Sequence, residues 1–231
     1  MSVSNDTALR SAALSSALAP MLRGKFCDIL LPNRTARIFA EKDVIYELGE
    51  QERVLFFVQR GVVKLGTIIH SGREIIYDIR KGGDVIGELS CFESPRRDRA
   101  VAVEPTEAVP VSFAEVMDVL AKHPVLLQNF IEACGSALSE AYDQINRLAE
   151  GNIEQNLVEV LKSLADKLGR PAGDLIEIAT YLTQEELSQM VVARRERVST
   201  ALNSLRRRGV LQYSPRGYLL VDMGALERYR S

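Results

Sequence analysis

The sequence predicts an α+β protein in which an antiparallel β domain precedes a long helix and a smaller second domain. Three observations support this prediction. Runs rich in Val, Ile, Phe and Tyr fill residues 35–113, the apolar period becomes helical after Pro124, and Glu150-Gly151-Asn152 interrupts that helix. We expect an N-terminal arm or helix at 1–24, a β domain at 25–123, a long helix at 124–150 and a second domain at 151–231.

The β domain is indicated by short β-branched and aromatic runs that alternate with regularly spaced glycines. Such runs are typical of antiparallel strands in a sandwich or barrel. Ser71-Gly72 lies between the runs Leu65–His70 and Glu74–Ile79. Glycine supplies the positive φ that a tight hairpin turn requires, so these two runs are expected to pair.

The long helix carries apolar residues at an alternating spacing of four and three, which is the a/d repeat of a coiled coil. This stripe is formed by Leu127, Ile131, Cys134, Leu138, Ala141, Ile145 and Leu148. A helix buries such a stripe against a partner helix, so the spacing predicts the seam of a parallel homodimer. An amphipathic helix packed within one chain is the alternative interpretation.

The second domain shows the pattern of a helix-turn-helix. Thr183 and Glu186 form a capping box that begins one helix, because each side chain satisfies a free backbone N–H of the first turn. After a short turn, a second helix is expected from about Arg194 to Arg208. A hairpin around Ser214-Pro215-Arg216-Gly217 adds a β wing.

The charge of the chain is distributed unevenly. The sequence contains 29 Lys+Arg and 31 Asp+Glu, a net charge of −2, which excludes a uniformly basic nucleic-acid-binding protein. Residues 194–216, however, contain seven arginines and the single acid Glu196, a net charge of +6. This local charge on a winged helix predicts binding to double-stranded DNA. A winged helix used for protein contacts is the alternative.

The sequence argues against several other classes of protein. The chain has no nucleophile–base pair, metal-spaced cluster or phosphate-binding GxxxxGK[ST] motif, so we do not expect an enzyme. Cys27, Cys91 and Cys134 are too few and too scattered for a disulfide scaffold, a structural zinc site or an iron–sulfur cluster. His70 and His123 are better explained as solvated residues than as haem ligands. We expect no metal or certain cofactor, a cytoplasmic protein, and no membrane span, since no apolar run approaches about 18 residues.

The order of these elements resembles the Crp/Fnr superfamily of bacterial transcription regulators. Two motifs carry the resemblance: Gly82-Gly83-Asp84-Val85-Ile86-Gly87-Glu88-Leu89, and Leu187-Ser188-Gln189-Met190 followed by Arg195-Glu196-Arg197-Val198-Ser199. The resemblance implies a cupin-like jelly roll of the cyclic-nucleotide-binding type, called the β-roll below. It also implies a homodimer on a palindromic operator, control by an effector in the β-roll, and RNA polymerase as a further partner.

The resemblance also assigns roles on the second helix of the helix-turn-helix. Arg195 and Glu196 occupy positions that read guanine and cytosine, Ser199 lies where some members touch thymine, and Thr200 stands where the family often has a second base-reading arginine. Val192 replaces a glycine common in the turn, so the turn is expected to differ slightly. Phosphate contacts are expected from Arg194, Arg197, Arg206, Arg207, Arg208 and Arg216.

The effector pocket departs from the family pattern. Members that bind cyclic nucleotides follow Gly-Glu-Leu with Arg-Ser/Thr-Ala, whereas this chain has Asp98-Arg99-Ala100 at the second motif. An acid therefore replaces the phosphate-binding arginine, and a carboxylate repels a phosphate in a partly buried site. The candidate pocket residues are Gly87, Glu88, Leu89, Arg97, Arg99, Ala100, Ala141 and Tyr142.

Three interpretations of the β-roll stay open: an effector other than cyclic AMP, no effector, or a cyclic-nucleotide-dependent activator that uses a shifted Arg97 or Arg99. The sequence disfavours cyclic AMP, because Ala141-Tyr142 also replaces the Thr-Ser that contacts adenine in the family. A regulatory cyclic-nucleotide module that does not bind DNA is the alternative from another functional class.

Overall fold

The computed structural model describes residues 25–88 and 95–229 of the chain. The expected N-terminal arm at 1–24 and Leu89 of the effector motif lie outside the described residues. The described residues form two compact units. One contains the residues up to Thr67 together with Tyr77–Ala141, and the other contains Ile68–Ile76 with the residues from Tyr142 onward.

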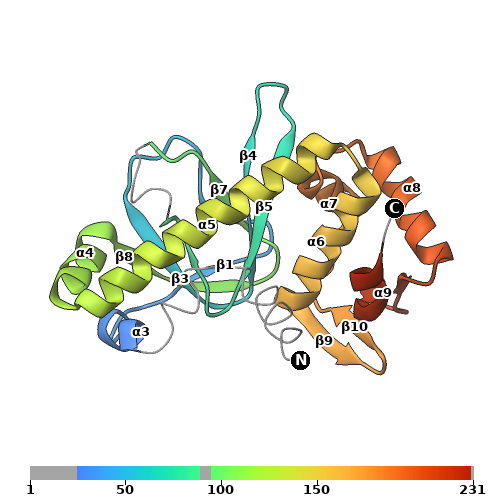
Figure 1. Ribbon diagram of the computed structural model, residues 1–231. Helices are drawn as coiled ribbons and strands as arrows, with labels where there is room; N and C mark the ends of the chain where they lie inside the picture. The colour runs from blue at the N-terminus through green and yellow to red at the C-terminus, as the bar shows by residue number, and fades with distance from the viewer. Residues whose placement is uncertain (1–24, 89–94, 230–231) are drawn as a thin grey trace, which may run out of the picture. The chain divides into compact units, whose positions relative to one another are not determined.

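Among the described residues of the first part of the chain, eight strands form two four-stranded sheets with the orders β1-β8-β3-β6 and β2-β7-β4-β5. Figure 1 labels six of these strands and the long helix α5. Neighbouring strands run antiparallel in the pairs β1–β8, β3–β8, β3–β6, β2–β7 and β4–β7. This jelly-roll arrangement confirms the predicted antiparallel β domain. The strands are β1 (Arg37–Phe39), β2 (Val44–Tyr46), β3 (Val54–Arg60), β4 (Val62–Ile68), β5 (Glu74–Lys81), β6 (Val85–Ile86), β7 (Arg99–Ala102) and β8 (Thr106–Ser112).

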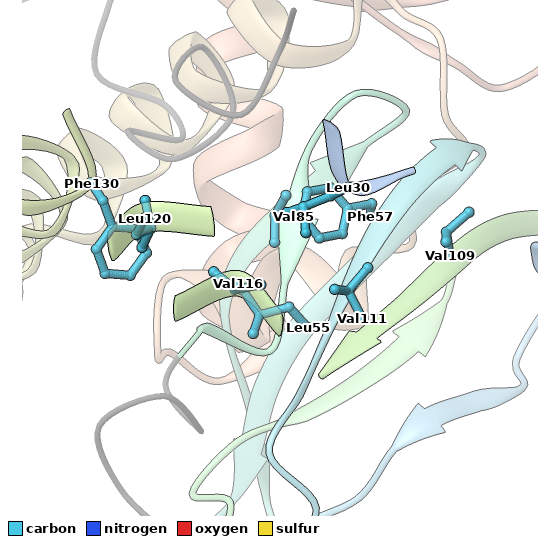
Figure 2. Packing of buried hydrophobic residues seen from close by; sticks show 9 residues of the cluster. All are labelled: Leu30, Leu55, Phe57, Val85, Val109, Val111, Val116, Leu120 and Phe130. Atoms are coloured by element: carbon cyan, nitrogen blue, oxygen red, sulfur yellow. The ribbon is translucent and has the colours of Figure 1, made fainter. Parts of the chain in front are cut away.

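Strand β3 is buried on both faces, and its alternating side chains join two different apolar clusters. Leu55 and Phe57 belong to one cluster, whereas Phe56 and Val58 belong to the other, because successive side chains of a strand point to opposite faces. The first cluster also contains Leu30, Val85, Val109, Val111, Val116, Leu120 and Phe130 (Figure 2). The second contains side chains from both sheets, including Tyr46 of β2 and Ala100 of β7.

Three helices contribute to the first cluster: α3 (Lys25–Leu30), α4 (Phe113–Lys122) and α5 (Pro124–Glu150). Helix α4 was not expected from the sequence, and it follows β8 without a break. Its start is well defined, since Ser112 and Glu115 form a capping box. Arg34 Nη2 lies 2.5 Å from Glu115 Oε1 and joins the end of the α3 segment to α4.

The long helix ends where the sequence predicted. Helix α5 stops at Glu150, Gly151 has φ +71°, and Asn152 caps the next helix by accepting a hydrogen bond from the backbone N–H of Gln155 at 3.1 Å. Gly151 adopts a left-handed conformation that favours glycine, so the chain changes direction there at little steric cost.

The second unit contains four helices and a four-stranded sheet with the order β11-β12-β10-β9. Strand β9 was not expected from the sequence, since it contains Pro171. Pro171 is tolerated there because β9 lies at the edge of the sheet. The elements are α6 (Ile153–Leu168), β9 (Gly169–Ala172), β10 (Leu175–Ile178), α7 (Gln184–Met190), α8 (Arg195–Arg207), β11 (Leu211–Tyr213), β12 (Leu219–Val221) and α9 (Met223–Arg228).

The core of the second unit forms where α6 packs against α8. Leu157 and Leu161 of α6 and Val198, Leu202 and Leu205 of α8 are all buried. Their spacing of three and four residues places them on one stripe of each helix. In the part of the chain that the structure describes, no helix has the length and hydropathy needed to cross a membrane.

Candidate nucleic-acid interface and effector site

Helices α7 and α8 form the predicted helix-turn-helix. Thr183 and Glu186 make the capping box of α7: Thr183 Oγ1 accepts from the backbone N–H of Glu186, whose carboxylate accepts from the backbone N–H of Thr183 at 2.9 Å. The turn that follows contains Val192 at φ +52°. This is the left-handed region that favours glycine, so the turn keeps a glycine-like conformation although a β-branched residue occupies it.

The N-terminal half of α8 gathers the predicted base-reading residues. Arg195, Glu196 and Thr200 are exposed and Ser199 is half-buried, so residues spaced by three and four lie close together on the helix surface. Thr200 Oγ1 donates a hydrogen bond to the carbonyl of Glu196 at 3.0 Å. The opposite stripe of the helix is held in the core by Val198, Ala201, Leu202 and Leu205.

Two arginines at the C-terminal end of α8, Arg206 and Arg208, have different partners. The Arg206 guanidinium lies 5.3 Å from the centre of the exposed Tyr213 ring on β11. Arg208 Nη1 instead donates to the Tyr229 hydroxyl at 2.8 Å, and Tyr229 in turn donates to Glu154. Burial and the Glu154 carboxylate raise the pKa of Tyr229 to about 12. Arg208 is therefore part of a network that joins α8, α9 and α6.

A groove of about 800 Å³ lies between α8 and the wing strand β11. Four of its residues, Asn203, Leu211, Gln212 and Tyr213, were not predicted as site residues from the sequence. Two of these residues could have been predicted from the sequence, because Asn203 precedes Arg206 by one helical turn and Tyr213 borders the predicted wing. Arg194 and Arg197 are exposed at the start of α8, and Arg216 is exposed in the wing turn. The groove is lined by Thr200, Asn203, Arg206, Arg207, Leu211, Gln212 and Tyr213.

In the β-roll, Gly87 and Glu88 of the effector motif meet two arginines that were not predicted from the sequence. Glu88 Oε1 accepts from Arg80 Nη2 at 3.0 Å. Arg80 Nε also lies 2.7 Å from Asp78 Oδ2. Gly87 has φ +87°, and a Cβ there would lie 2.9 Å from Arg96 Nη1. Glycine is therefore required both by the backbone conformation and by the approach of Arg96.

Asp98 is also part of this arrangement. Its side chain is buried at 3% exposure, and Asp98 Oδ2 accepts from the Tyr46 hydroxyl at 2.8 Å. The Arg96 guanidinium lies 4.0 Å from the centre of the Tyr46 ring, and Arg96 Nη2 donates to the Val54 carbonyl at 2.5 Å. We call Tyr46, Arg80, Glu88, Arg96 and Asp98 the buried charge cluster.

The electrostatics of the cluster reflect its burial. Desolvation raises the pKa of Glu88 against the opposing effect of Arg80, and desolvation raises the pKa of Asp98 against the hydrogen bond from Tyr46. Burial and then the nearby Asp98 raise the pKa of Tyr46. Among the described residues, Arg80 Nη1, Arg96 Nη1 and Asp98 Oδ1 have no hydrogen-bond partner.

The other predicted pocket residues that the structure describes have surroundings different from those of the cluster. Arg97 is exposed, and Arg99 Nη2 lies 3.1 Å from Glu47 Oε2, so that Arg99 makes an ion pair with a different residue. Ala100 is buried in the core, whereas Ala141 and Tyr142 are exposed on α5. Tyr46, Arg80 and Arg96 could not be predicted as partners of Glu88 and Asp98, because only the tertiary fold brings them together.

The predicted dimer stripe on α5 divides into two parts. Leu127 and Cys134 pack against the apolar cluster of the first unit. Ile131, Leu138 and Ile145 are 62%, 54% and 59% exposed. Ala141 and Leu148 are exposed as well, and Tyr142 extends this apolar surface.

Comparison with known proteins covers both units. Residues 36–123 match the cyclic nucleotide-binding domain, and residues 155–229 match the Crp-like helix-turn-helix domain. The transcriptional regulator LdrP of Thermus thermophilus is 31% identical over 191 residues, which are 82% of this chain and 94% of that protein. The CRP-like cAMP-activated global transcriptional regulator of Mycobacterium tuberculosis is 27% identical and covers 82% of this chain and 85% of its own length.

Solved structures share the fold. FixK2 from Bradyrhizobium japonicum superimposes with a TM-score of 0.73 at 18% identity, covering 86% of this chain and 98% of that one. A mutant of CooA from Carboxydothermus hydrogenoformans gives 0.72 at 21% identity, covering 94% and 96%. Together with the two domain matches and the relative from Thermus, these findings show that the chain belongs to the Crp/Fnr superfamily of transcription regulators.

Proposed function

We propose that this chain is a homodimeric regulator that binds a palindromic operator by placing α8 in the major groove. The observation that carries the proposal is the N-terminal half of α8, where Arg195 and Glu196 are exposed while the opposite stripe is locked in the core. A helix held in this way presents side chains to base edges in a fixed orientation. The two recognition helices of a dimer would read half-sites about 34 Å apart.

The side chains of α8 divide naturally between base and phosphate recognition. A guanidinium at Arg195 suits the paired acceptors of guanine, and the Glu196 carboxylate accepts from the amino group of cytosine. Thr200 lacks the paired N–H donors of an arginine, and its hydroxyl already donates to the helix backbone. We therefore expect Thr200 to contribute a packing contact to base recognition. Arg206 and Arg207 line the groove beside the wing, where they suit the phosphate backbone.

The homodimer rests on the exposed part of the α5 stripe. Ile131, Leu138, Tyr142 and Ile145 follow spacings of seven, four and three residues, which keep them near one side of the helix. Large apolar side chains gathered on one helix surface mark a contact with another surface. A second copy of α5 supplies a matching stripe, because a two-fold axis pairs the same residues on both chains.

Regulation by a cyclic nucleotide is the second candidate, because the β-roll matches the cyclic nucleotide-binding domain and the relative from Mycobacterium is described as cAMP-activated. The residues at the site do not fit that ligand well. Asp98 presents a buried carboxylate, while the arginines nearby already face other carboxylates. The function proposed for this chain is therefore DNA binding without a required cyclic nucleotide.

The test is selection of binding sites from random double-stranded DNA by the full-length protein, followed by fluorescence anisotropy on the selected site. We expect a palindromic consensus, bound by two chains, and much weaker binding to scrambled DNA. Binding of a single chain, or equal affinity for scrambled DNA at every salt concentration, would contradict the proposal. Absence of DNA binding at low salt would favour the regulatory module that does not contact DNA.

A further inference from the structure

We propose that the buried charge cluster replaces a ligand in the β-roll: the protein's own carboxylates neutralise the two arginines that a phosphate ligand would need. This inference rests on the function proposed above and concerns how that function is regulated. Its consequence is that the β-roll is stable and competent for DNA binding without a cyclic nucleotide.

Carboxylates lie near both arginines of the cluster. Arg80 lies beside Asp78 and Glu88, at 2.7 and 3.0 Å. Arg96 is held near Asp98 through the Tyr46 ring, and its Nε lies 4.0 Å from Glu50 Oε2. Both guanidiniums therefore already face carboxylates. A cyclic phosphate would add a further negative charge to a buried region in which acids outnumber arginines.

Hydrogen bonding at Asp98 also disfavours a phosphate ligand. A cyclic phosphate oxygen only accepts hydrogen bonds, and so does an ionised carboxylate. Asp98 Oδ1 is buried and has no hydrogen-bond partner among the described residues. A phosphate brought near it would leave this acceptor unpaired and would add electrostatic repulsion. The carboxylate therefore selects against the ligand class that the fold family implies.

Arg96 packs closely against the backbone around the cluster. Arg96 is buried and crosses Gly87 so closely that any side chain there would collide with its guanidinium. Its Nη2 donates to the Val54 carbonyl at 2.5 Å, and its guanidinium carbon lies 4.0 Å from the centre of the Tyr46 ring. Arg96 thus ties β3, the turn at Gly87 and β2 together. An arginine used in this way is a structural bridge and is not free to rotate toward a ligand.

The decisive measurement is the response of the wild-type full-length protein to cyclic AMP and cyclic GMP, each at millimolar concentration. An effector of an allosteric regulator typically changes affinity for the second ligand by about 5- to 150-fold. We expect no change in operator affinity and no rise in melting temperature. A change of that size, or a rise of about 5 °C or more with saturating nucleotide, would overturn the proposal.

Two variants test the role of the cluster itself. Asp98→Ala leaves the Tyr46 hydroxyl buried without its acceptor, and Tyr46→Phe removes the hydroxyl while keeping the ring under Arg96. Each should lower the melting temperature by about 2–10 °C, and added cyclic AMP should not restore it. The matched controls are Asp118→Ala and Tyr77→Phe, which change exposed residues of the same types. Equal melting temperatures for cluster variants and controls would contradict the proposal.

The experiment also separates this inference from the proposed function. The melting measurements use no DNA, so they decide the role of the cluster even if the chain selects no operator. Conversely, binding of a homodimer to a palindromic operator that requires a cyclic nucleotide would support the proposed DNA recognition by α8, but it would overturn this inference and the proposed independence from a cyclic nucleotide.

Discussion

Arginines occupy two contrasting settings in this chain. On α8, Arg195, Arg197 and Arg206 are exposed, and the only acid in that charged region is Glu196. In the β-roll, Arg80 and Arg96 are buried, and carboxylates lie beside them. The same residue type is therefore open to solvent in one unit and enclosed by the fold in the other.

The difference follows from solvation. An exposed guanidinium keeps its water and exchanges it for a phosphate or a base when DNA arrives. A buried guanidinium has already lost its water, so the fold must supply opposite charge and hydrogen bonds at once. An exposed charge is thus available for a ligand. A buried charge that is paired with carboxylates of the same chain is not available.

The largest effect is expected at the exposed apolar stripe of α5. Replacing both Leu138 and Ile145 by glutamate should give a monomer, because four acids would face one another across the two-fold axis. Operator affinity should fall by about 100-fold or more, since the second half-site is no longer held at high effective concentration. Sedimentation velocity and anisotropy measure the two outcomes.

Val125→Glu is the control for this experiment. Val125 is 70% exposed on the same helix, but its position lies away from the stripe. A double variant that stays dimeric, or a Val125→Glu variant that becomes monomeric, would refute the assignment of the seam.

A smaller effect, confined to sequence preference, is expected at Glu196. Glu196→Ala should relax the choice of base at one position in each half-site, reducing discrimination there by about 1–3 kcal/mol. Competition between the selected operator and single-base variants measures it. Glu185→Ala, which removes an exposed acid from α7, should leave the preference intact. Unchanged base preference in Glu196→Ala would remove this residue from the base-reading set.

Arg206→Ala should weaken binding to operator and scrambled DNA alike, because a phosphate contact carries no sequence information. The slope of log affinity against log salt should become shallower by about 0.9 for each phosphate that the variant no longer neutralises, or roughly two per dimer. Arg170→Ala provides the control, since it removes an exposed arginine from the edge strand β9. A selective reduction of affinity for the operator would instead make Arg206 a base-reading residue.

The smallest effect is expected at Glu115. Its side chain is less exposed than the arginines of α8 and more exposed than the arginines of the buried charge cluster. The hydrogen bond from Arg34 and those from Ser112 lower the pKa of Glu115 to about 2. A depressed acid stabilises the fold above its unfolded pKa of 4.5 and loses this contribution as the pH falls toward 2. Because the side chain is nearly half exposed, the loss should stay below about 1 kcal/mol.

Urea unfolding of the wild type and of Glu115→Gln over this acidic range measures the contribution. The difference in unfolding free energy between the two proteins should shrink as the pH falls. A difference that is independent of pH would show that the capping box, and not the charge, accounts for the effect of Glu115.

Much of the fold could be predicted from the sequence because it depends on local patterns. The capping box at Thr183, the helix break at Gly151 and the hairpin at Gly72 each involve residues within a few positions of one another. Helix α4 and strand β9 were not predicted, since α4 starts directly after a strand and β9 contains a proline at a sheet edge.

The two sites differ in the same respect. By itself, the sequence determined helix α8, because its charges and its apolar stripe lie on thirteen consecutive residues. Only the tertiary structure showed which residues surround Glu88 and Asp98 in the β-roll. Tyr46 lies 52 residues from Asp98, and the pairing of β2 with β7, which begins directly after Asp98, brings the two side chains together. A buried carboxylate can contact a ligand or a residue of its own chain. Long-range packing decides between the two, and a local sequence pattern does not show it.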